Sequence, residues 1–269
     1  MKPRVLAAID NSMTAGSVLT TARALADLYD ADVDVVHVRE DGHRHVSALA
    51  QAEQLPITIL EEGDVASAIA ESARAPDVVA LVLGTRSTPD GLARAGHITQ
   101  SVACSMLKPV VVVPPGVDHH RELRRMLVPL DGDITTSEAA AAVMRLARKR
   151  GVDLVVLHVL DECTMPPFED QAQYEAVAWR EEFTRRHCRP LGDEASLELR
   201  TGIPSGEILD VARSIDADAI LVAWGGDLSE HRATVVHELL ERSRAPLILI
   251  PLVGEAKAQV PKRVETSAV

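Results

Sequence analysis

The sequence repeats one series of short runs rich in Val, Ile and Leu, and this repeat limits the folds that the chain can adopt. Five such runs fall in the first half, at residues 5–9, 33–38, 57–60, 78–83 and 110–113. Five more fall in the second half, at 126–130, 154–159, 197–199, 219–224 and 247–250. Between them, segments such as 14–28 and 137–149 place apolar residues every three or four positions, which is typical of amphipathic helices. Alternating strands and helices predict an α/β fold with a parallel sheet covered by helices.

Residues at or near the ends of these runs also correspond between the two halves. The pairs are Asp10 with Asp131, His37 with His158, Gly63 with Gly202, Gly84 with Gly225, and Pro109 with Pro246. The first two pairs are 121 residues apart and the Gly84 pair is 141 apart, so the second copy carries an insertion. That insertion lies between Leu160 and Leu197.

The insertion contains a polar, helix-capable stretch at residues 169–187. Within it Tyr174, Val177, Ala178 and Phe183 are expected to form an apolar stripe. Two interpretations stay open, a longer crossover helix and a docking surface for a partner protein.

Charge and cysteine content restrict the class of protein. The net charge of −12 disfavours nucleic acid and anionic membrane surfaces as partners. A membrane-spanning helix needs roughly 18 to 20 apolar residues, and no apolar run in the sequence approaches that length. The apolar run at 5–9 is also too short for the apolar region of a signal peptide. The three cysteines show no paired spacing and fit reduced thiols. We therefore expect a soluble, cytoplasmic protein.

A stretch of prolines and glycine separates the two copies. Pro114, Pro115 and Gly116 end the last strand pattern of the first half and cannot continue a helix. The expected organisation is a first domain at 1–117, a linker at 118–124, a second domain at 125–253 and a polar tail at 254–269.

Each copy resembles the universal stress protein family. The matching features are the acid that follows strand 1 (Asp10, Asp131), the His-Val pair that closes strand 2, the glycine before helix 3 (Gly63, Gly202) and the glycine after strand 4. The resemblance implies two tandem five-stranded parallel-sheet domains of the adenine nucleotide alpha hydrolase-like type, with strand order 3-2-1-4-5. It also implies that the copies pack through their fifth strands as an intramolecular pseudo-dimer; a homodimer is a further possibility.

Members of this family that bind ATP carry the pattern G-x2-G-x9-G-(S/T) after strand 4. In the first copy Gly84 and Gly96 match the first and third glycines, Ser87 replaces the second, and His97 replaces the final hydroxyl residue. The resemblance implies ATP with magnesium as the ligand. It places Asp10 at the ribose or adenine, Val38 against the base, and Gly84, Gly96, His97, Ile98 and Thr99 around the phosphates.

The second copy keeps fewer of these residues. Asp131, Val159, Gly225 and Thr234 correspond to the family positions, whereas Leu228 and Ala233 replace the second and third glycines. Glycines let the backbone approach a phosphate closely, so their loss predicts a weaker second site.

Simpler roles for the same residues stay open. Asp10 would serve as a helix cap and the two glycines would relieve turns. Ser205, which follows Pro204 at a helix entry, is expected to be an N-cap rather than a nucleophile.

No Walker loop, G-x-G-x-x-G motif or G-x-S-x-G elbow is present, and no residue is assigned a catalytic or metal-binding role. Three functions remain for the chain. The first is a stress-response protein that senses an adenine nucleotide and acts through a protein partner. The others are an interaction module with decayed sites and, last, a slow nucleotide hydrolase.

Overall fold

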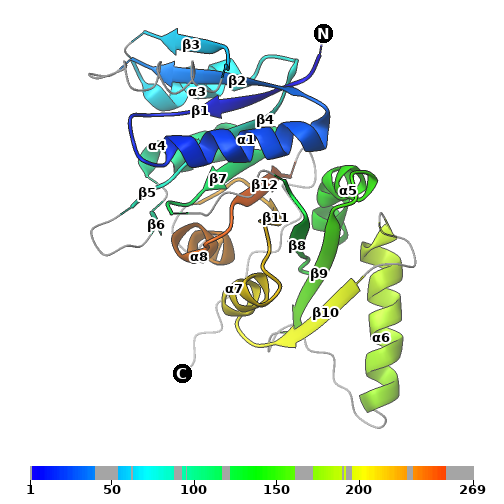
Figure 1. Cartoon of the computed structure of the whole chain (residues 1–269). Helices are drawn as coiled ribbons and strands as arrows, with labels where there is room; N and C mark the ends of the chain where they lie inside the picture. The colour runs from blue at the N-terminus through cyan, green and yellow to red at the C-terminus, as the bar shows by residue number, and fades with distance from the viewer. Residues whose placement is uncertain are drawn as a thin grey trace, which may run out of the picture.

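A computed structural model describes residues 2–39, 54–61, 63–87, 93–94, 96–116, 122–160, 172–189, 191, 196–228 and 233–252. These residues form one large sheet with helices against both faces (Figure 1). The strands of the first half are β1 (Arg4–Ala8), β2 (Asp32–Val38), β3 (Ile57–Leu60), β4 (Val78–Gly84) and β7 (Val110–Val113). Those of the second half are β8 (Arg125–Pro129), β9 (Asp153–Leu160), β10 (Ser196–Thr201), β11 (Ala219–Trp224) and β12 (Leu247–Pro251).

The helices follow the strands in the same order in both halves. In the first half they are α1 (Ala15–Tyr29), α3 (Val65–Ala73) and α4 (His97–Ser105). In the second half they are α5 (Ile134–Lys149), α6 (Ala172–His187), α7 (Pro204–Ser214) and α8 (Thr234–Arg242). A short hairpin of β5 (Arg86–Ser87) and β6 (Ala93–Arg94), which the sequence did not predict, stands between β4 and α4.

The order of strands confirms the expected topology. It runs β10-β9-β8-β11-β12-β7-β4-β1-β2-β3, so each half has the order 3-2-1-4-5 with parallel neighbours. The halves meet where β12 pairs antiparallel with β7, with Ile248 opposite Val111. The two copies therefore join through their fifth strands into one ten-stranded sheet.

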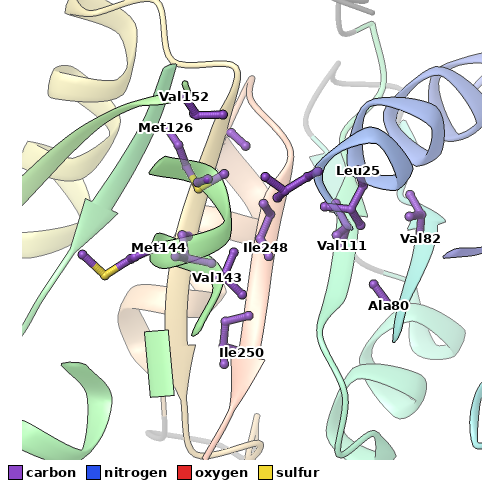
Figure 2. Close-up of a cluster of buried hydrophobic side chains, with 14 of the residues drawn as sticks. Leu25, Ala80, Val82, Val111, Met126, Val143, Met144, Val152, Ile248 and Ile250 are labelled. Carbon is purple, nitrogen blue, oxygen red and sulfur yellow. The ribbon is translucent and has the colours of Figure 1, made fainter. Parts of the chain in front are cut away.

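The hydrophobic core continues across this junction. Figure 2 shows Leu25 of α1 and Val111 of β7 beside Ile248 of β12 and Val143 of α5, and all four belong to one buried cluster. Burying one such side chain stabilises the fold by about 1.5–3 kcal/mol. Because both halves supply this cluster, their interface has the character of a domain interior.

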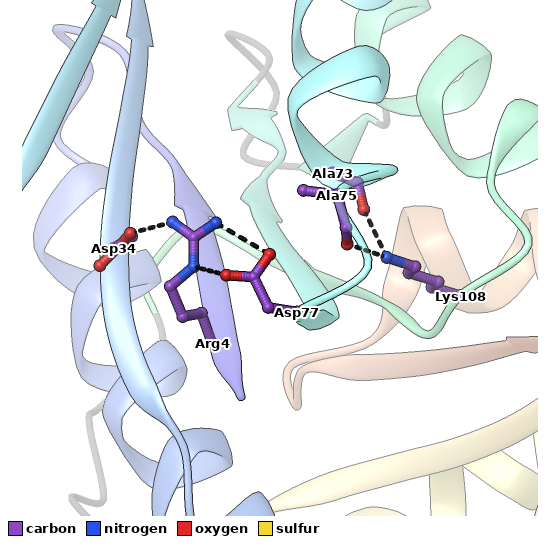
Figure 3. Close-up of polar contacts among 6 residues, drawn as sticks. All are labelled: Arg4, Asp34, Ala73, Ala75, Asp77 and Lys108. Carbon is purple, nitrogen blue, oxygen red and sulfur yellow. Dashed lines mark hydrogen bonds and ion pairs between the residues drawn. The ribbon is translucent and has the colours of Figure 1, made fainter. Parts of the chain in front are cut away.

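Ion pairs fix the strands at the edge where β1 and β8 begin. Arg4 binds Asp77 through its Nε at 2.6 Å and also pairs with Asp34 (Figure 3). In the second half Arg125 pairs with Asp153 at 2.7 Å. Lys108 donates to the carbonyl oxygens of Ala73 and Ala75 at the C-terminal end of α3, where a positive charge is favourable (Figure 3).

The inserted helix α6 buries a different face from the one expected. Phe183 is buried and stacks on Trp179 at 5.0 Å and against His158 of β9 at 4.6 Å between ring centroids. His187, one turn farther on, is also buried, whereas Val177 is 56% exposed. The predicted stripe is therefore wrong apart from Phe183; the side chain of Tyr174 lies outside the described residues. The packed face instead follows the spacing 179, 183, 187.

The predicted cap at Ser205 is also wrong. Helix α7 begins at Pro204 with Ile203 as its N-cap, so Ser205 lies inside the first turn. Its hydroxyl donates to the carboxylate of Glu238 in α8 at 2.7 Å, which ties α7 to α8. The linker prediction at 118–124 falls mostly outside the described residues, and its boundaries stay a prediction. Across the described part of the chain no helix has the length and apolar character needed to cross a membrane.

Candidate functional site

A cavity of about 260 Å³ opens at the carboxyl ends of β1, β2 and β4. The start of α1, the first turns of α3 and the start of α4 complete its walls. β1 and β4 are neighbours, and the chain reverses its winding between them. In open parallel sheets this switch point is the usual place for a ligand.

The seven residues that the resemblance implied for the first copy all line this cavity. They are Asp10, Val38, Gly84, Gly96, His97, Ile98 and Thr99. They come from the ends of β1, β2 and β4 and from the start of α4, and so from positions up to 89 residues apart in the sequence. The structure thus brings these seven residues together.

The apolar part of the wall comes from strand ends and from the helices packed beside them. Val38 and Leu83 are buried strand-end residues, and Ile69 of α3 and Val102 of α4 line the same space and belong to the same hydrophobic cluster. A mostly apolar wall with a few polar groups is typical of small-molecule sites.

Asp10 occupies the turn between β1 and α1. Its carboxylate accepts a hydrogen bond from the backbone N–H of Ser12 at 3.0 Å. The N-cap of α1 is Thr14, so the interpretation of Asp10 as a helix cap is wrong. The carboxylate instead orders the turn that forms one side of the cavity.

Gly84 and Gly96 have different structural roles, and neither has a left-handed φ. A β-carbon at Gly84 would lie 3.0 Å from Cγ2 of Thr14 and 3.2 Å from Cγ2 of Val18, so Gly84 permits α1 to pack closely on β4. A β-carbon at Gly96 would meet nothing within 4 Å. The interpretation of both glycines as turn relief is therefore wrong.

Helix α4 presents its N-terminus to the cavity. Gly96 is its N-cap and supplies no side-chain hydrogen bond, and the first turn includes His97, Ile98 and Thr99. Backbone N–H groups of a first helical turn have no partner within the helix and favour an anion. This end of the cavity is thus suited to one anionic group.

Three hydroxyl groups around the cavity donate to the backbone, whereas the hydroxyl of Ser12 accepts from the backbone N–H of Thr14 at 3.3 Å. Thr99 donates to the carbonyl oxygen of Gly84 at 3.1 Å, and Thr14 donates to that of Thr85 at 3.4 Å. Thr85 in turn donates to the carbonyl oxygen of Val113 at 3.4 Å. Because each hydroxyl has one proton, these three groups keep only acceptor capacity toward a ligand.

Charge in the cavity is sparse. Among the described residues that line it, Asp10 is the one carboxylate, His97 is the one imidazole exposed to solvent, and none is Lys or Arg. Hydrogen bonds from Ser67 and, to a smaller extent, the charge of His97 hold the pKa of Asp64, the N-cap of α3, below its ordinary value. No group of three or more metal-ligating side chains occurs among the described residues.

The second repeat keeps the turn at its aspartate but begins its last helix differently. Asp131 accepts a hydrogen bond from the backbone N–H of Asp133, as Asp10 does from Ser12, and another from the hydroxyl of Thr136. Val159 is the next-to-last residue of β9, and Gly225 directly follows β11. Thr234 begins α8 after Ala233, which has a left-handed φ of 48°.

Two large apolar residues take the positions that line the cavity in the first repeat. Trp224, which corresponds to Leu83, is buried at the end of β11. Val236, which corresponds to Thr99, packs in the same cluster with Leu239 and Ile208. Sequence reasoning missed the burial of these two residues, although the repeat offset pairs each residue with its counterpart.

Comparison with known proteins agrees with the repeat and the topology. Residues 122–251 match the model of the Universal stress protein family. The second repeat belongs to the universal stress protein family. No curated protein sequence matches the chain.

Solved structures extend this likeness to the whole fold. A universal stress protein from Archaeoglobus fulgidus DSM 4304 aligns with 93% of this chain and 98% of its own, at 17% identity and a TM-score of 0.65. A protein of unknown function from Pseudomonas aeruginosa PAO1 covers 96% and 95%, at 15% identity and a TM-score of 0.63. A half-length match is the Archaeoglobus fulgidus universal stress protein in complex with dAMP, with 22% identity, 47% and 97% coverage and a TM-score of 0.36.

Proposed function

We propose that this universal stress protein binds an adenine nucleotide in its first repeat and responds by changing its contacts with a protein partner. The observation that supports the proposal is the convergence of seven family-type residues on one cavity at the switch point. The apolar slot between Val38 and Leu83 accommodates the base, Asp10 accepts hydrogen bonds from ribose hydroxyls, and the N-terminus of α4 receives phosphate.

The second repeat acts as a structural partner in this proposal. Trp224 and Val236, the counterparts of the cavity-lining Leu83 and Thr99, are buried in one hydrophobic cluster. The interaction-module function is thus favoured for this half of the chain. The two repeats thus have different roles: the first binds the ligand and the second supports the shared sheet.

The junction between repeats offers a route for a response. Helix α8 contacts β6, which belongs to the hairpin between Gly84 and Gly96. His97 lines the nucleotide cavity and also a groove that Asp227 and Leu228 of the second repeat complete. A ligand at the start of α4 therefore touches the same residue that faces the second repeat.

Thermal unfolding of the full chain tests the binding step. A ligand at 100 times its dissociation constant adds about 2.7 kcal/mol to the free energy of unfolding. The variant Gly96→Val is expected to lose the shift, because its side chain enters open space at the cavity. Gly225→Val is the matched control, since a β-carbon there also meets nothing within 4 Å.

The outcomes separate the three functions. A shift with adenine nucleotides that Gly96→Val removes and Gly225→Val retains supports nucleotide sensing. The absence of any shift with adenosine, AMP, ADP, ATP or cyclic AMP contradicts it and leaves the interaction module. Release of phosphate in excess over protein, measured under the same conditions, indicates a hydrolase.

A further inference from the structure

Helix α5 ends in a run of positive charge. Its exposed cations are Arg145, Arg148 and Lys149 in the last turns and Arg150 at the C-cap, and we call these four residues the basic end of α5. We propose that the basic end docks a short acidic segment of a partner protein. None of the four residues lines the cavity of the first repeat, so this inference goes beyond nucleotide binding and does not require it.

The shared fold does not require these cations. The two repeats keep a constant offset of 121 residues from the turn after strand 1 to the end of strand 2, which pairs Arg148 with Asp27 of α1. Asp27 is exposed, and the last turn of α1 contains no basic residue. Both helices pack on the same buried cluster. The positive charge is therefore particular to the second repeat.

The helix dipole accounts for only part of the run. It favours cations in the last turn of a helix, here Arg148 and Lys149, and the effect falls off beyond that turn. Arg145 lies one turn earlier, and Arg150 follows the helix. The run of cations is thus longer than the dipole favours.

Helices α7 and α8 pair their last cations within the helix, whereas α5 does not. Arg213 of α7 pairs with Asp210, three residues before it, and α8 has a comparable pair. The one acidic residue of α5 is Glu138, seven residues before Arg145 and about 10 Å away along the axis. Pairs within a helix form between residues three or four positions apart, so the basic end has no such partner in α5.

The carboxylates beside the basic end belong to weak or separate ion pairs. Asp30, which follows α1, lies 3.7 Å from Arg150, and the side chain of Asp30 is 87% exposed. A pair so exposed contributes little, and a carboxylate of a partner can replace it. Asp153, at the start of β9, pairs with Arg125 at 2.7 Å. With Asp27 and Asp30 of α1 counted, the four cations still leave the surface positive.

The extent of the basic end favours a short acidic partner. Arg145 and Arg150 are five residues apart, about 7.5 Å along the helix, which matches two to three residues, roughly, of an extended peptide. Arginine binds a carboxylate through two parallel hydrogen bonds, and clusters of arginine recognise acidic motifs. Nucleic acids and anionic membranes carry longer arrays of charge, which would extend past the basic end onto a molecule of net charge −12.

Fluorescence anisotropy of the full chain with a labelled peptide tests the inference. The probe carries four consecutive glutamates between glycine-serine flanks, and the matched peptide carries four glutamines. We expect the glutamate peptide to bind at least about tenfold more tightly in about 0.01 M salt, and this difference to shrink in about 1 M salt, where charges are screened. Equal binding of the two peptides, or no binding of the glutamate peptide at low salt, overturns the inference.

A charge-matched pair of double variants locates the surface. Arg145→Gln with Lys149→Gln is expected to lower the affinity for the glutamate peptide at least about threefold, as for two exposed ion pairs. Arg74→Gln with Arg213→Gln is the control, because it changes the net charge equally at the ends of α3 and α7, which pack on the other buried cluster. Glutamine is as good a helix former as Lys or Arg, so both variants keep their helices. Equal losses in the two variants contradict the basic end as the docking surface.

Other polyanions are measured in parallel with the parent chain. The probes are a short DNA duplex and vesicles that contain phosphatidylserine. We expect both to bind more weakly than the glutamate peptide. Tighter binding of either one, lost in Arg145→Gln with Lys149→Gln, overturns the choice of a protein partner.

Discussion

The imidazole Nδ1 of His37 donates a hydrogen bond to the carbonyl oxygen of Ile9 at 2.9 Å. His158 repeats this bond in the second half, to the carbonyl oxygen of Leu130 at 2.7 Å. A carbonyl can only accept, so both rings carry their proton on Nδ1. This bond holds the end of β2 against the end of β1 in the first repeat, and the end of β9 against the end of β8 in the second. The repeats therefore share the strand ends, and they differ in the side chains that surround them.

These two histidines are expected to respond differently to replacement by Leu. His158→Leu loses the hydrogen bond and the ring contacts with Phe183 and Trp179, so we expect a loss of about 1–3 kcal/mol in the free energy of unfolding. His37→Leu also removes a buried Nε2 that has no hydrogen-bond partner among the described residues, which offsets part of the loss. Urea unfolding of both variants measures the difference. Equal losses contradict this account.

Replacement by alanine is expected to destabilise the protein more at Gly84 than at Gly96. Gly84→Ala places a methyl group against Thr14 and Val18, and overpacking of this kind costs about 1–3 kcal/mol. Gly96→Ala meets open space and is expected to cost less than about 1 kcal/mol at an N-cap. Thermal unfolding of the two variants without ligand gives the comparison. A larger loss for Gly96→Ala would contradict the packing role of Gly84.

Much of the fold was predictable because the repeat places the same signals twice. The paired residues Asp10 and Asp131, with equal spacing to the next histidine, predict equivalent strand ends, and the family resemblance implied the order 3-2-1-4-5. The spacing to Pro109 likewise predicts Gly96 at the start of α4. These signals are local in the sequence. The strand order then brings the residues that carry them together around one cavity.

Other features depend on contacts between distant segments. The role of Gly84 requires the position of α1, which is set by packing. The burial of Trp224 depends on which face of β11 carries its ring. The buried face of α6 was wrongly predicted because His187 was left out of the apolar pattern, although its ring packs against Phe183 at 4.5 Å.

The described cysteines are expected to differ in reactivity. Burial raises the pKa of the Cys188 thiol to about 11, so little thiolate forms at pH 8. Cys104 is half-buried on α4. In a Cys163→Ser background, which removes the cysteine outside the described residues, iodoacetamide at pH 8 should modify Cys104 first. Mass spectrometry of the digested protein measures both sites. Labelling of Cys188 at an equal rate in the folded protein contradicts its burial.

The docking of α6 is expected to weaken in mild acid. Burial, followed by the charges of Arg186 and His158, lowers the pKa of His187, whereas Asp131 and Asp133 oppose the shift. The ring also contacts the hydroxyl of Ser137 at 2.8 Å. The unfolded chain then binds more protons than the folded chain below the ordinary imidazole pKa of about 6.5. This contribution to stability is present above about pH 6.5 and is lost as the pH falls through the folded pKa.

Urea unfolding at pH 7.5 and pH 5.5 measures the effect of His187. We expect the loss of stability between these pH values to be smaller in His187→Gln than in the parent chain, because the variant has no titrating group at this position. Fluorescence of Trp179 in a Trp224→Phe background follows the helix itself. An unchanged pH dependence in His187→Gln would exclude His187 as its source.

We propose that the two repeats of one fold differ in function, with a single nucleotide site in the first. The decisive experiment is a calorimetric titration of AMP into the full chain, with Gly96→Val and Gly225→Val measured in parallel. We expect one AMP per chain, loss of binding in Gly96→Val and retention of binding in Gly225→Val. Two AMP molecules per chain, or binding that Gly225→Val abolishes and Gly96→Val retains, would contradict it.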